Sequence, residues 1–187
     1  NIVLLIQIFF FFSIVHCEKN WFFQYGNSKQ NIFQSIAEIP DDGYILVGNS
    51  NTLGNGKNDI WIVRLDQNLK FQWQRYLGGD GDDFGKDIIF SNNSFIVLAQ
   101  KNEQNNKNTW LLKLDSSGDI MWSRTYGDGK EDIAHSIKKI KDKGFLITGM
   151  KTAINKSQQG WVMLINEDGD LIWEKSFGGT GNDGFYD

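Results

Sequence analysis

The residues best suited to chemistry lie in a glycine-rich turn that recurs along the chain. One copy, residues 78–83, carries Asp80, Asp82 and Asp83, and carboxylate oxygens in a flexible turn are ligands that Ca²⁺ accepts. The other interpretation is an Asx turn, in which the carboxylate accepts backbone N–H bonds as the chain enters the next strand. The acid that closes the turn recurs as Asp83, Asp132 and Asp183, with Asn31 in the first copy. This recurrence favours the Asx turn, and calcium stays a candidate for residues 80–83 alone.

Two familiar motifs overlap the last copy of this turn. Residues 178–185 match a calcium-binding nonapeptide of parallel β-rolls, but that site needs nonapeptides back to back, and this chain has one copy in about 50 residues. Gly179, Gly181 and Gly184 also have the spacing of the dinucleotide-binding fingerprint, which requires a following helix that these residues do not predict. We interpret both matches as consequences of a glycine-rich turn and expect no bound cofactor.

Catalytic constellations find little support in the sequence. His135 is the only histidine after residue 18, and Cys17 is the only cysteine, so neither a catalytic triad nor a histidine-based metal site can be assembled from the usual residues. Glycoside hydrolysis needs two carboxylates about 5–10 Å apart. Glu131, Glu167 and Glu174 lie in or beside predicted turns, and nothing singles out a pair. We therefore predict no catalytic, cofactor-binding or metal-binding residues and expect His135 to be a packed or surface residue of a strand.

The elements that position these turns repeat with a period of about 50 residues. All seven tryptophans follow this period: Trp21, Trp73, Trp122 and Trp173 form one series, and Trp61, Trp110 and Trp161 form the other. A period of this length is typical of repeat architectures such as β-propellers. Each repeat contains four short apolar runs separated by Gly, Asn and Asp, which predicts four antiparallel strands joined by hairpins. The expected fold is therefore all-β, built from propeller-type repeats.

The predicted units have definite bounds. Three complete four-stranded blades are expected at about residues 32–78, 84–127 and 133–178 of a repeat domain over residues 18–187, with partial repeats at residues 20–26 and 179–187. The second run of each unit is apolar at successive positions, so we expect it to be buried on both faces between neighbouring blades. The tryptophans are expected to stabilise contacts between blades rather than to form an exposed platform for sugars.

Departures from the repeat single out further positions. Ala99 stands where the other repeats have Gly48 and Gly149, and Asn68-Leu69 stands where a turn glycine is expected. The most divergent segments, residues 50–58, 100–108 and 151–159, connect the second and third runs and are candidates for ligand specificity. The alternative for these loops is drift without a packing constraint. Asn92 and Asn155 begin N-x-Ser sequons, which a eukaryotic host could glycosylate.

The N-terminal residues and the charge bear on location. Residues 1–17 are apolar and carry no acidic or lysine side chain, which is typical of a secretory signal peptide and is short for a membrane span. We expect residue 18 to begin a mature chain that is extracellular or at the cell surface and has no membrane span; Cys17 as a lipidation site is the alternative. A net charge of −4 and the lack of a basic patch argue against nucleic-acid binding.

The repeats resemble a known family. The pattern around residues 78–88, the segments 42–48 and 143–149, and the W-[LIV]-x-[KR]-LD run are similar to SBBP-type β-propeller repeats of secreted and surface proteins. Residues 114–122 also resemble the tryptophan-docking motif of quinoprotein dehydrogenases, with a turn one residue shorter and no quinone-binding residue to carry over. The resemblance implies a propeller and a secreted location, and it implies no reaction.

Blade number leaves several functional alternatives. Rings usually need four to eight blades, so three complete units predict part of a larger ring, with self-association through open blade edges as the alternative. We expect a non-catalytic binding or interaction module with a protein or glycan partner. The alternative is a fragment of a carbohydrate-active or quinoprotein-like enzyme.

Overall fold

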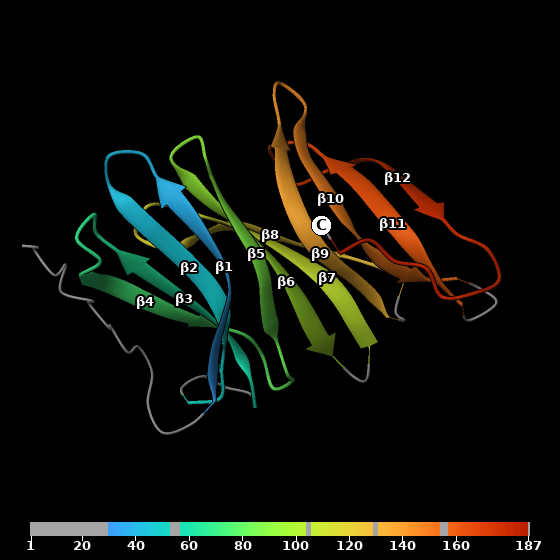
Figure 1. The fold of residues 1–187 in the computed structure, drawn as a ribbon, viewed down its shortest axis with the longest axis horizontal. Helices are drawn as coiled ribbons and strands as arrows, with labels where there is room; N and C mark the ends of the chain where they lie inside the picture. The colour runs from blue at the N-terminus through green and yellow to red at the C-terminus, as the bar shows by residue number, and fades with distance from the viewer. Residues whose placement is uncertain (1–29, 53–56, 104–105, 129–130, 154–156, 187) are drawn as a thin grey trace, which may run out of the picture.

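The computed structural model describes residues 30–52, 57–103, 106–128, 131–153 and 157–186. Within these ranges the chain forms twelve strands and no helix. The strands make three four-stranded antiparallel sheets, and Figure 1 shows the sheets fanned out side by side in chain order. The predicted all-β fold is confirmed. The expected signal peptide, Cys17, the partial repeat at residues 20–26 and the sequon asparagine Asn155 lie outside the described residues.

Each sheet is a meander in which consecutive strands pair. The first sheet comprises β1 (Asn31–Ile39), β2 (Gly43–Ser50), β3 (Asp59–Leu65) and β4 (Phe71–Leu77). The second comprises β5 (Phe84–Ser91), β6 (Ser94–Glu103), β7 (Asn106–Leu114) and β8 (Ile120–Tyr126). The third comprises β9 (Asp132–Ile140), β10 (Gly144–Thr152), β11 (Gln158–Ile165) and β12 (Leu171–Phe177). These bounds agree closely with the three units expected from the turn residues.

In the second and third sheets, the connection between the second and third strands is shorter than predicted, whereas in the first sheet it agrees with the predicted loop. In the second sheet the expected loop over residues 100–108 is largely strand, because Lys101 pairs with Asn108 and Glu103 pairs with Asn106. In the third sheet Lys151 and Thr152 likewise continue β10. Polar residues at the end of a hairpin can extend a strand because the backbone ladder supplies the hydrogen bonds whatever the side chains are. Polarity alone therefore misplaced these loop boundaries.

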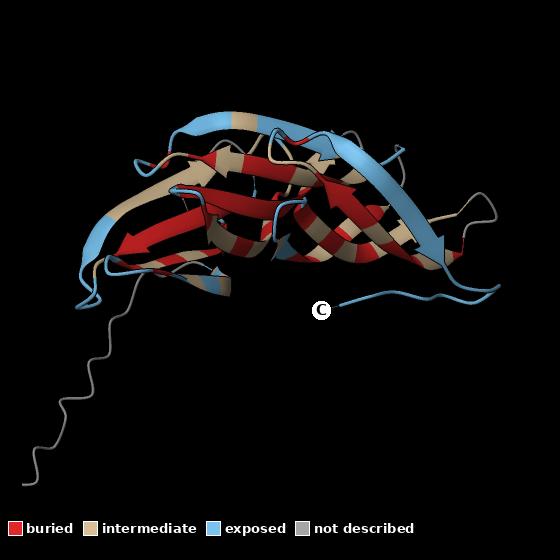
Figure 2. Cartoon of the chain, turned by 90° about the horizontal axis from the view of Figure 1, so that it is seen from above, coloured by how far each residue is buried: buried red, intermediate tan, exposed pale blue. Residues whose placement is uncertain are grey.

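Two apolar clusters hold the three sheets together. Buried residues of the first and second sheets meet in one cluster, which includes Ile45, Val47, Ile60, Ile62, Phe95, Val97 and Leu112. Residues of the second and third sheets meet in the other, which includes Ile96, Leu98, Leu111, Phe145, Ile147, Trp161 and Met163. Figure 2 shows the buried residues concentrated within the fan and the exposed ones along its outer strands.

The extent to which the second strand of a sheet is buried depends on whether the sheet has one neighbouring sheet or two. In the middle sheet, the whole apolar run of β6 is buried, since successive side chains alternate between the two clusters. In the flanking sheets, Leu46 of β2 and Leu146 of β10 are only half-buried. The expectation of burial on both faces is thus confirmed for β6 and is wrong for β2 and β10.

The side to which each tryptophan packs depends on the strand that carries it. Trp110 and Trp161, in the third strands, pack toward the preceding sheet, and Trp73 and Trp122, in the fourth strands, pack toward the following sheet. Trp173, at the same position of β12, has no such cover and is 38% exposed. The predicted structural role therefore fits Trp110, Trp161, Trp73 and Trp122, whereas Trp173 lies on an open sheet face.

Each first strand carries one β-bulge at the same place. The pairing shifts between Phe33 and Ser35, between Gly85 and Asp87, and, opposite Thr148 and Gly149, between Ala134 and Ser136. Next to each bulge one residue of the facing pair is small: Gly48 faces Phe33, Gly85 faces Ala99, and Gly149 faces Ala134. A Cβ at Gly48 would lie 1.8 Å from the carbonyl oxygen of Ile32, so the backbones approach too closely there for a side chain. Ala99 is accommodated in the second sheet, where the glycine is on the opposite strand.

The glycine-rich turns that connect the sheets are closed by their last acid. The Asp83 carboxylate accepts the N–H groups of Gly79 (2.8 Å) and Asn102 (3.0 Å). The Asp132 carboxylate does the same for Asp128 and Thr152, at 2.7 and 3.1 Å. Burial raises the pKa of the Asp132 carboxyl, and these N–H bonds oppose the rise. The predicted Asx-type turn is confirmed.

The third copy of this turn follows the same path. Gly179 N–H donates to Asp183 (3.0 Å), the N–H of Asp183 donates to the carbonyl of Gln158 (2.8 Å), and the N–H of Phe185 donates to that of Gly149 (3.1 Å). The bond to Gln158 corresponds to the one from Asp83 to Asn58 in the first copy. Residues 178–186 form no strand, so the first-strand beginning that we expected in residues 179–187 is not present in the described part.

One carboxylate joins all three sheets. Asp87 of β5 accepts a hydrogen bond from the hydroxyl of Ser35 in β1 at 2.6 Å. Its other oxygen accepts from the N–H of Ile137 in β9 at 2.9 Å and from the hydroxyl of Ser136 at 3.4 Å. The three residues Ser35, Asp87 and Ser136 directly follow the bulges of the three first strands. These strands therefore meet at a shared polar contact.

Candidate functional site

The candidate calcium ligands point to different partners. Asp83 is 1% exposed and accepts the backbone bonds described above. Asp82 accepts a hydrogen bond from the side-chain amide of Asn58 at 2.7 Å, and Asp80 is exposed. Within the described ranges, no group of three or more His, Cys, Asp or Glu side chains could hold a metal ion. Asp82 and Asp83 thus make contacts within the turn and with neighbouring strands.

The three glutamates considered for catalysis make separate contacts. Glu174 is inside β12 rather than beside a turn, and its carboxylate accepts the indole N–H of Trp161 at 2.8 Å. Glu131 pairs with Lys107 beside a short parallel bridge, and Glu167 pairs with Lys139. Each carboxylate is therefore engaged in a different contact between strands or turns.

Two titratable side chains occupy bulge positions on neighbouring first strands. Lys86 is the extra residue of the bulge in β5, and His135 is the extra residue of the bulge in β9. The His135 ring lies 5.0 Å from that of Tyr186, between centroids, and its Nε2 atom is buried without a hydrogen-bond partner in the described structure. Burial lowers the pKa of His135, and the charge of Lys86 lowers it further. Burial also lowers the pKa of Lys86.

This environment predicts a pH dependence of stability. An unfolded histidine has a pKa of about 6.5, and the folded value lies below it, so the unfolded chain binds this proton more tightly. The free energy of unfolding should therefore fall as the pH drops from about 6.5 through the folded pKa. Urea unfolding of the wild type and of His135→Gln, measured between pH 5 and 8, should show that the variant lacks this part of the slope. Identical slopes in the two proteins would contradict the assignment to His135.

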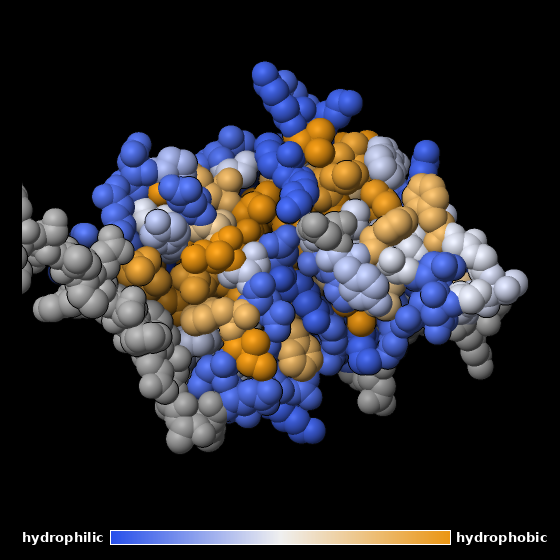
Figure 3. Space-filling model, viewed as in Figure 1, coloured by the Kyte–Doolittle hydropathy of each residue, from blue (hydrophilic) through white to orange (hydrophobic). Residues whose placement is uncertain are grey.

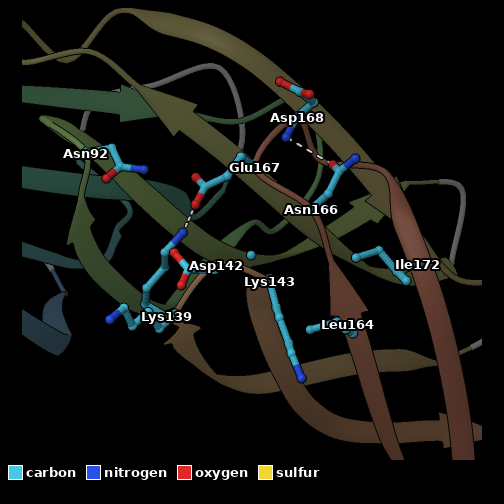
Figure 4. Close-up of a pocket in the computed structure, with 11 residues that line it drawn as sticks. Asn92, Lys139, Asp142, Lys143, Leu164, Asn166, Glu167, Asp168 and Ile172 are labelled. Carbon is cyan, nitrogen blue, oxygen red and sulfur yellow. Dashed lines mark hydrogen bonds and ion pairs between the residues drawn. The ribbon is translucent and has the colours of Figure 1, made fainter.

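A groove bordered by Asn92 of the second sheet and by turns of the third sheet is a candidate binding site. It has a volume of 1080 Å³ and lies where the first turn and the third turn of the third sheet come together (Figure 4). Lys139, Lys141, Asp142, Lys143 and Gly144 come from the end of β9, the turn that follows and the start of β10. Asn92, Leu164, Asn166, Glu167, Asp168 and Ile172 complete the lining.

Backbone conformation places the polar residues of the groove. Asn92 and Asn93, with φ values of 50° and 56°, form the two-residue turn between β5 and β6, a conformation that asparagine tolerates well. Asp142 has a φ of 57° in the equivalent turn of the third sheet, and Gly144 follows with 101°. The side-chain oxygen of Asn166 accepts the N–H groups of Asp168 and Asp170, at 3.0 and 2.7 Å, which fixes the other wall. Short, well-bonded turns thus form the rim.

The charges of the groove are mixed. Lys139 forms an ion pair with Glu167, which joins the two turns across the groove (Figure 4), and its ammonium lies 4.7 Å from the centroid of the Phe145 ring. Partial burial lowers the pKa of Lys139, the charge of Lys113 in the second sheet lowers it further, and Asp142 acts in the opposite direction. Lys141 and Lys143 are exposed, and Figure 3 shows hydrophilic side chains projecting at the turn between β9 and β10. The groove therefore offers lysine ammonium groups and carboxylates close together.

An apolar side chain supplements these charges. Ile172 of β12 is 53% exposed, and Leu164 of β11 is 8% exposed, and both line the groove. A partner with acidic, basic and aliphatic groups in succession could pair with the charges and cover Ile172. The arrangement is suited to binding by complementary contacts.

Sequence reasoning missed this groove. The candidates for ligand specificity were the loops at residues 50–58, 100–108 and 151–159, with drift as the alternative, and the turn at residues 141–143 was not among them. Parts of those loops lie outside the described residues, and the rest is mainly strand. The useful signal was that first and third turns of a four-stranded meander lie at the same end of the sheet. That rule brings the turn at residues 141–143 next to the turn at residues 166–170.

No protein-family model matches the chain, and no curated protein matches it significantly. Among the residues that the structure describes, none belongs to a helix that could cross a membrane.

Proposed function

We propose that this chain is a non-catalytic binding module that takes up an extended polypeptide segment in the groove between its second and third sheets. The observation that carries the proposal is the lining itself, in which exposed Lys141 and Lys143 lie beside carboxylates and beside Ile172. Side chains of a polypeptide supply acidic, basic and aliphatic groups at the spacing of a few ångströms that such a lining requires. A glycan is the other partner class, and the test separates the two.

Two features support a propeller and a location outside the cell for this module. The three sheets share one plan of strands, bulges and glycine-rich connections, which supports assignment of the repeats to SBBP-type propeller blades. The apolar run at residues 1–17 supports secretion through a signal peptide. Binding through turns at one end of stacked sheets is the usual way in which propellers use this architecture.

The test begins with a peptide selected on the protein itself. Selection of random 12-residue peptides by phage display should enrich sequences that combine Asp or Glu with an aliphatic residue. A synthetic copy of an enriched peptide should bind the wild type and should bind Lys141→Glu/Lys143→Glu about tenfold more weakly, as isothermal titration calorimetry would measure, since two favourable charge contacts become repulsive.

The control carries the same change of net charge elsewhere. Lys57→Glu/Lys70→Glu alters two exposed lysines of the first sheet, outside the groove, and should retain the wild-type affinity. Equal losses of affinity in both double variants would show that the effect comes from the net charge of the protein and not from the groove. Failure to enrich any peptide, together with binding to an array of defined glycans, would contradict the polypeptide proposal and point to the glycan class.

A further inference from the structure

The contact between neighbouring sheets includes a recurring pair, a fourth-strand tryptophan and the third turn of the next sheet. Trp73 of β4 lies against Gly118, where a Cβ would be 2.8 Å from Cη2 of the indole. Trp122 of β8 lies against Gly169, where a Cβ would be 3.0 Å from Cζ3. Both glycines have positive φ, 82° and 83°. The positive φ favours glycine in this turn, and the close approach of the ring leaves no room for a side chain there.

A basic residue two positions after each tryptophan completes the contact. The Arg75 guanidinium lies 5.3 Å from the Trp73 ring centroid and donates to the carbonyl of Ser117 at 2.8 Å. Arg124 lies 5.8 Å from the Trp122 ring centroid, and its side chain also approaches Gly169. At both contacts, the ring and the cation of one sheet thus pack on the glycine turn of the following sheet.

The third sheet presents the same pair without a turn against it. Trp173 is 38% exposed, and the ammonium of Lys175 lies 5.7 Å from its ring centroid. Leu146 and Val162 point away from the second sheet on the same face, by alternation with Phe145 and Trp161. This face, called the open face below, repeats the aliphatic and aromatic composition of the faces that receive the second and third sheets.

A second copy of this chain does not fit the open face. Docking in the same geometry would bring the outward face of the first sheet of the copy against Trp173, but Trp61 and Val63 on that face are 2% and 0% exposed, so it is already covered. Its third turn carries Leu69, with a φ of 60°, where the other sheets have glycine. The leucine side chain would occupy the volume that the indole needs.

We propose that the open face is a docking surface for one more four-stranded sheet of this repeat type, joined through residues 178–186 and carrying glycine at its third turn. Residues 178–186 support a covalent connection, because their hydrogen bonds to Gln158 and Gly149 start the path that leads from each sheet to the next. The required glycine follows from the two internal contacts at Gly118 and Gly169. The proposal rests on contacts other than those that carry the ligand groove, and the two surfaces adjoin at Leu164, which lines the groove and pairs with Trp173.

The test extends the chain by a sheet of known type. Residues 1–183 are followed by a second copy of residues 84–127, which is in register because Asp83 and Asp183 hold equivalent places and which brings Gly118 opposite Trp173. Hydroxyl-radical footprinting with mass spectrometry should show oxidation of Trp173 falling to the level of Trp73, which occurs once in the extended chain and is covered by the second sheet. The matched control has Gly118→Leu in the added copy only, and Trp173 should then be oxidised as in the parent chain.

Three results would overturn the proposal. Equal protection of Trp173 in the glycine and leucine versions would remove the requirement for glycine. An added segment that stays unfolded, with no gain of β-structure by circular dichroism, would mean that the face does not accept such a sheet. Protection of Trp173 in the parent chain that increases with protein concentration would assign the face to a second copy.

Discussion

Replacement of Trp122 by alanine is expected to lower the free energy of unfolding by about 3 kcal/mol. The indole packs into the cluster between the second and third sheets and covers Gly169, so its removal leaves a cavity at a contact between sheets. The indole nitrogen is buried without a hydrogen-bond partner in the described structure, so the loss is one of packing. For a chain of this size, the melting temperature should fall by roughly 6–12 °C.

Trp173→Ala is the position-matched control. Trp173 is the third residue of β12, as Trp122 is the third residue of β8, but 38% of it is exposed. We expect a smaller loss of about 1.5 kcal/mol, because more than a third of the side chain already lies in solvent and its removal leaves no cavity between two sheets. Thermal and urea unfolding of the two variants should therefore differ clearly. Equal losses would contradict the rule that a following sheet determines the contribution of these tryptophans.

Gly48→Ala should destabilise the first sheet by about 3 kcal/mol, since overpacking against a rigid backbone is near the upper end of such costs. The new methyl group would lie 1.8 Å from the Ile32 carbonyl oxygen and 2.7 Å from Cα of Phe33. These are backbone atoms of the bulged strand β1, and they cannot move aside without breaking its pairing with β2. Urea unfolding measured by circular dichroism would show the change as a lower midpoint.

Gly79→Ala provides the comparison for a glycine without close neighbours. A Cβ at Gly79 would meet no atom within 4 Å, and the backbone N–H bond to Asp83 would remain. The expected change in stability is within about 0.5 kcal/mol. A large effect of Gly79→Ala, or a small effect of Gly48→Ala, would show that the glycines of the repeat serve another purpose.

Much of the fold could be predicted because the repeat averages out local ambiguity. Three copies of each run, with a turn residue such as Gly144 or Gly169 after it, located the sheets within one or two residues. The turn acids were also predictable, since Asp83 and Asp132 occupy one position and an Asx turn explains both. These features depend on contacts between residues close in sequence.

The groove and the exposed state of Trp173 depend on contacts that no local pattern encodes. Trp122 and Trp173 have similar sequence surroundings, and only the presence of a following sheet distinguishes them. Likewise, the glycine next to the bulge lies on the second strand in the first sheet (Gly48) and on the first strand in the second sheet (Gly85). This difference can be interpreted only when the strand pairing is known. Polar hairpin ends were misplaced because side-chain polarity does not report backbone pairing.

The carboxylate of Asp87 bears on how the chain loses its structure. In an ideal linear array each repeat interacts with its immediate neighbours alone, so terminal units can fray independently. Here the first and third sheets hold the same acceptor, through Ser35 on one side and Ile137 on the other. Detachment of either outer sheet would remove a donor from this partly buried carboxylate and expose the contact to water. We therefore expect the outer sheets to unfold less independently than the ends of such an array, because one side chain links them.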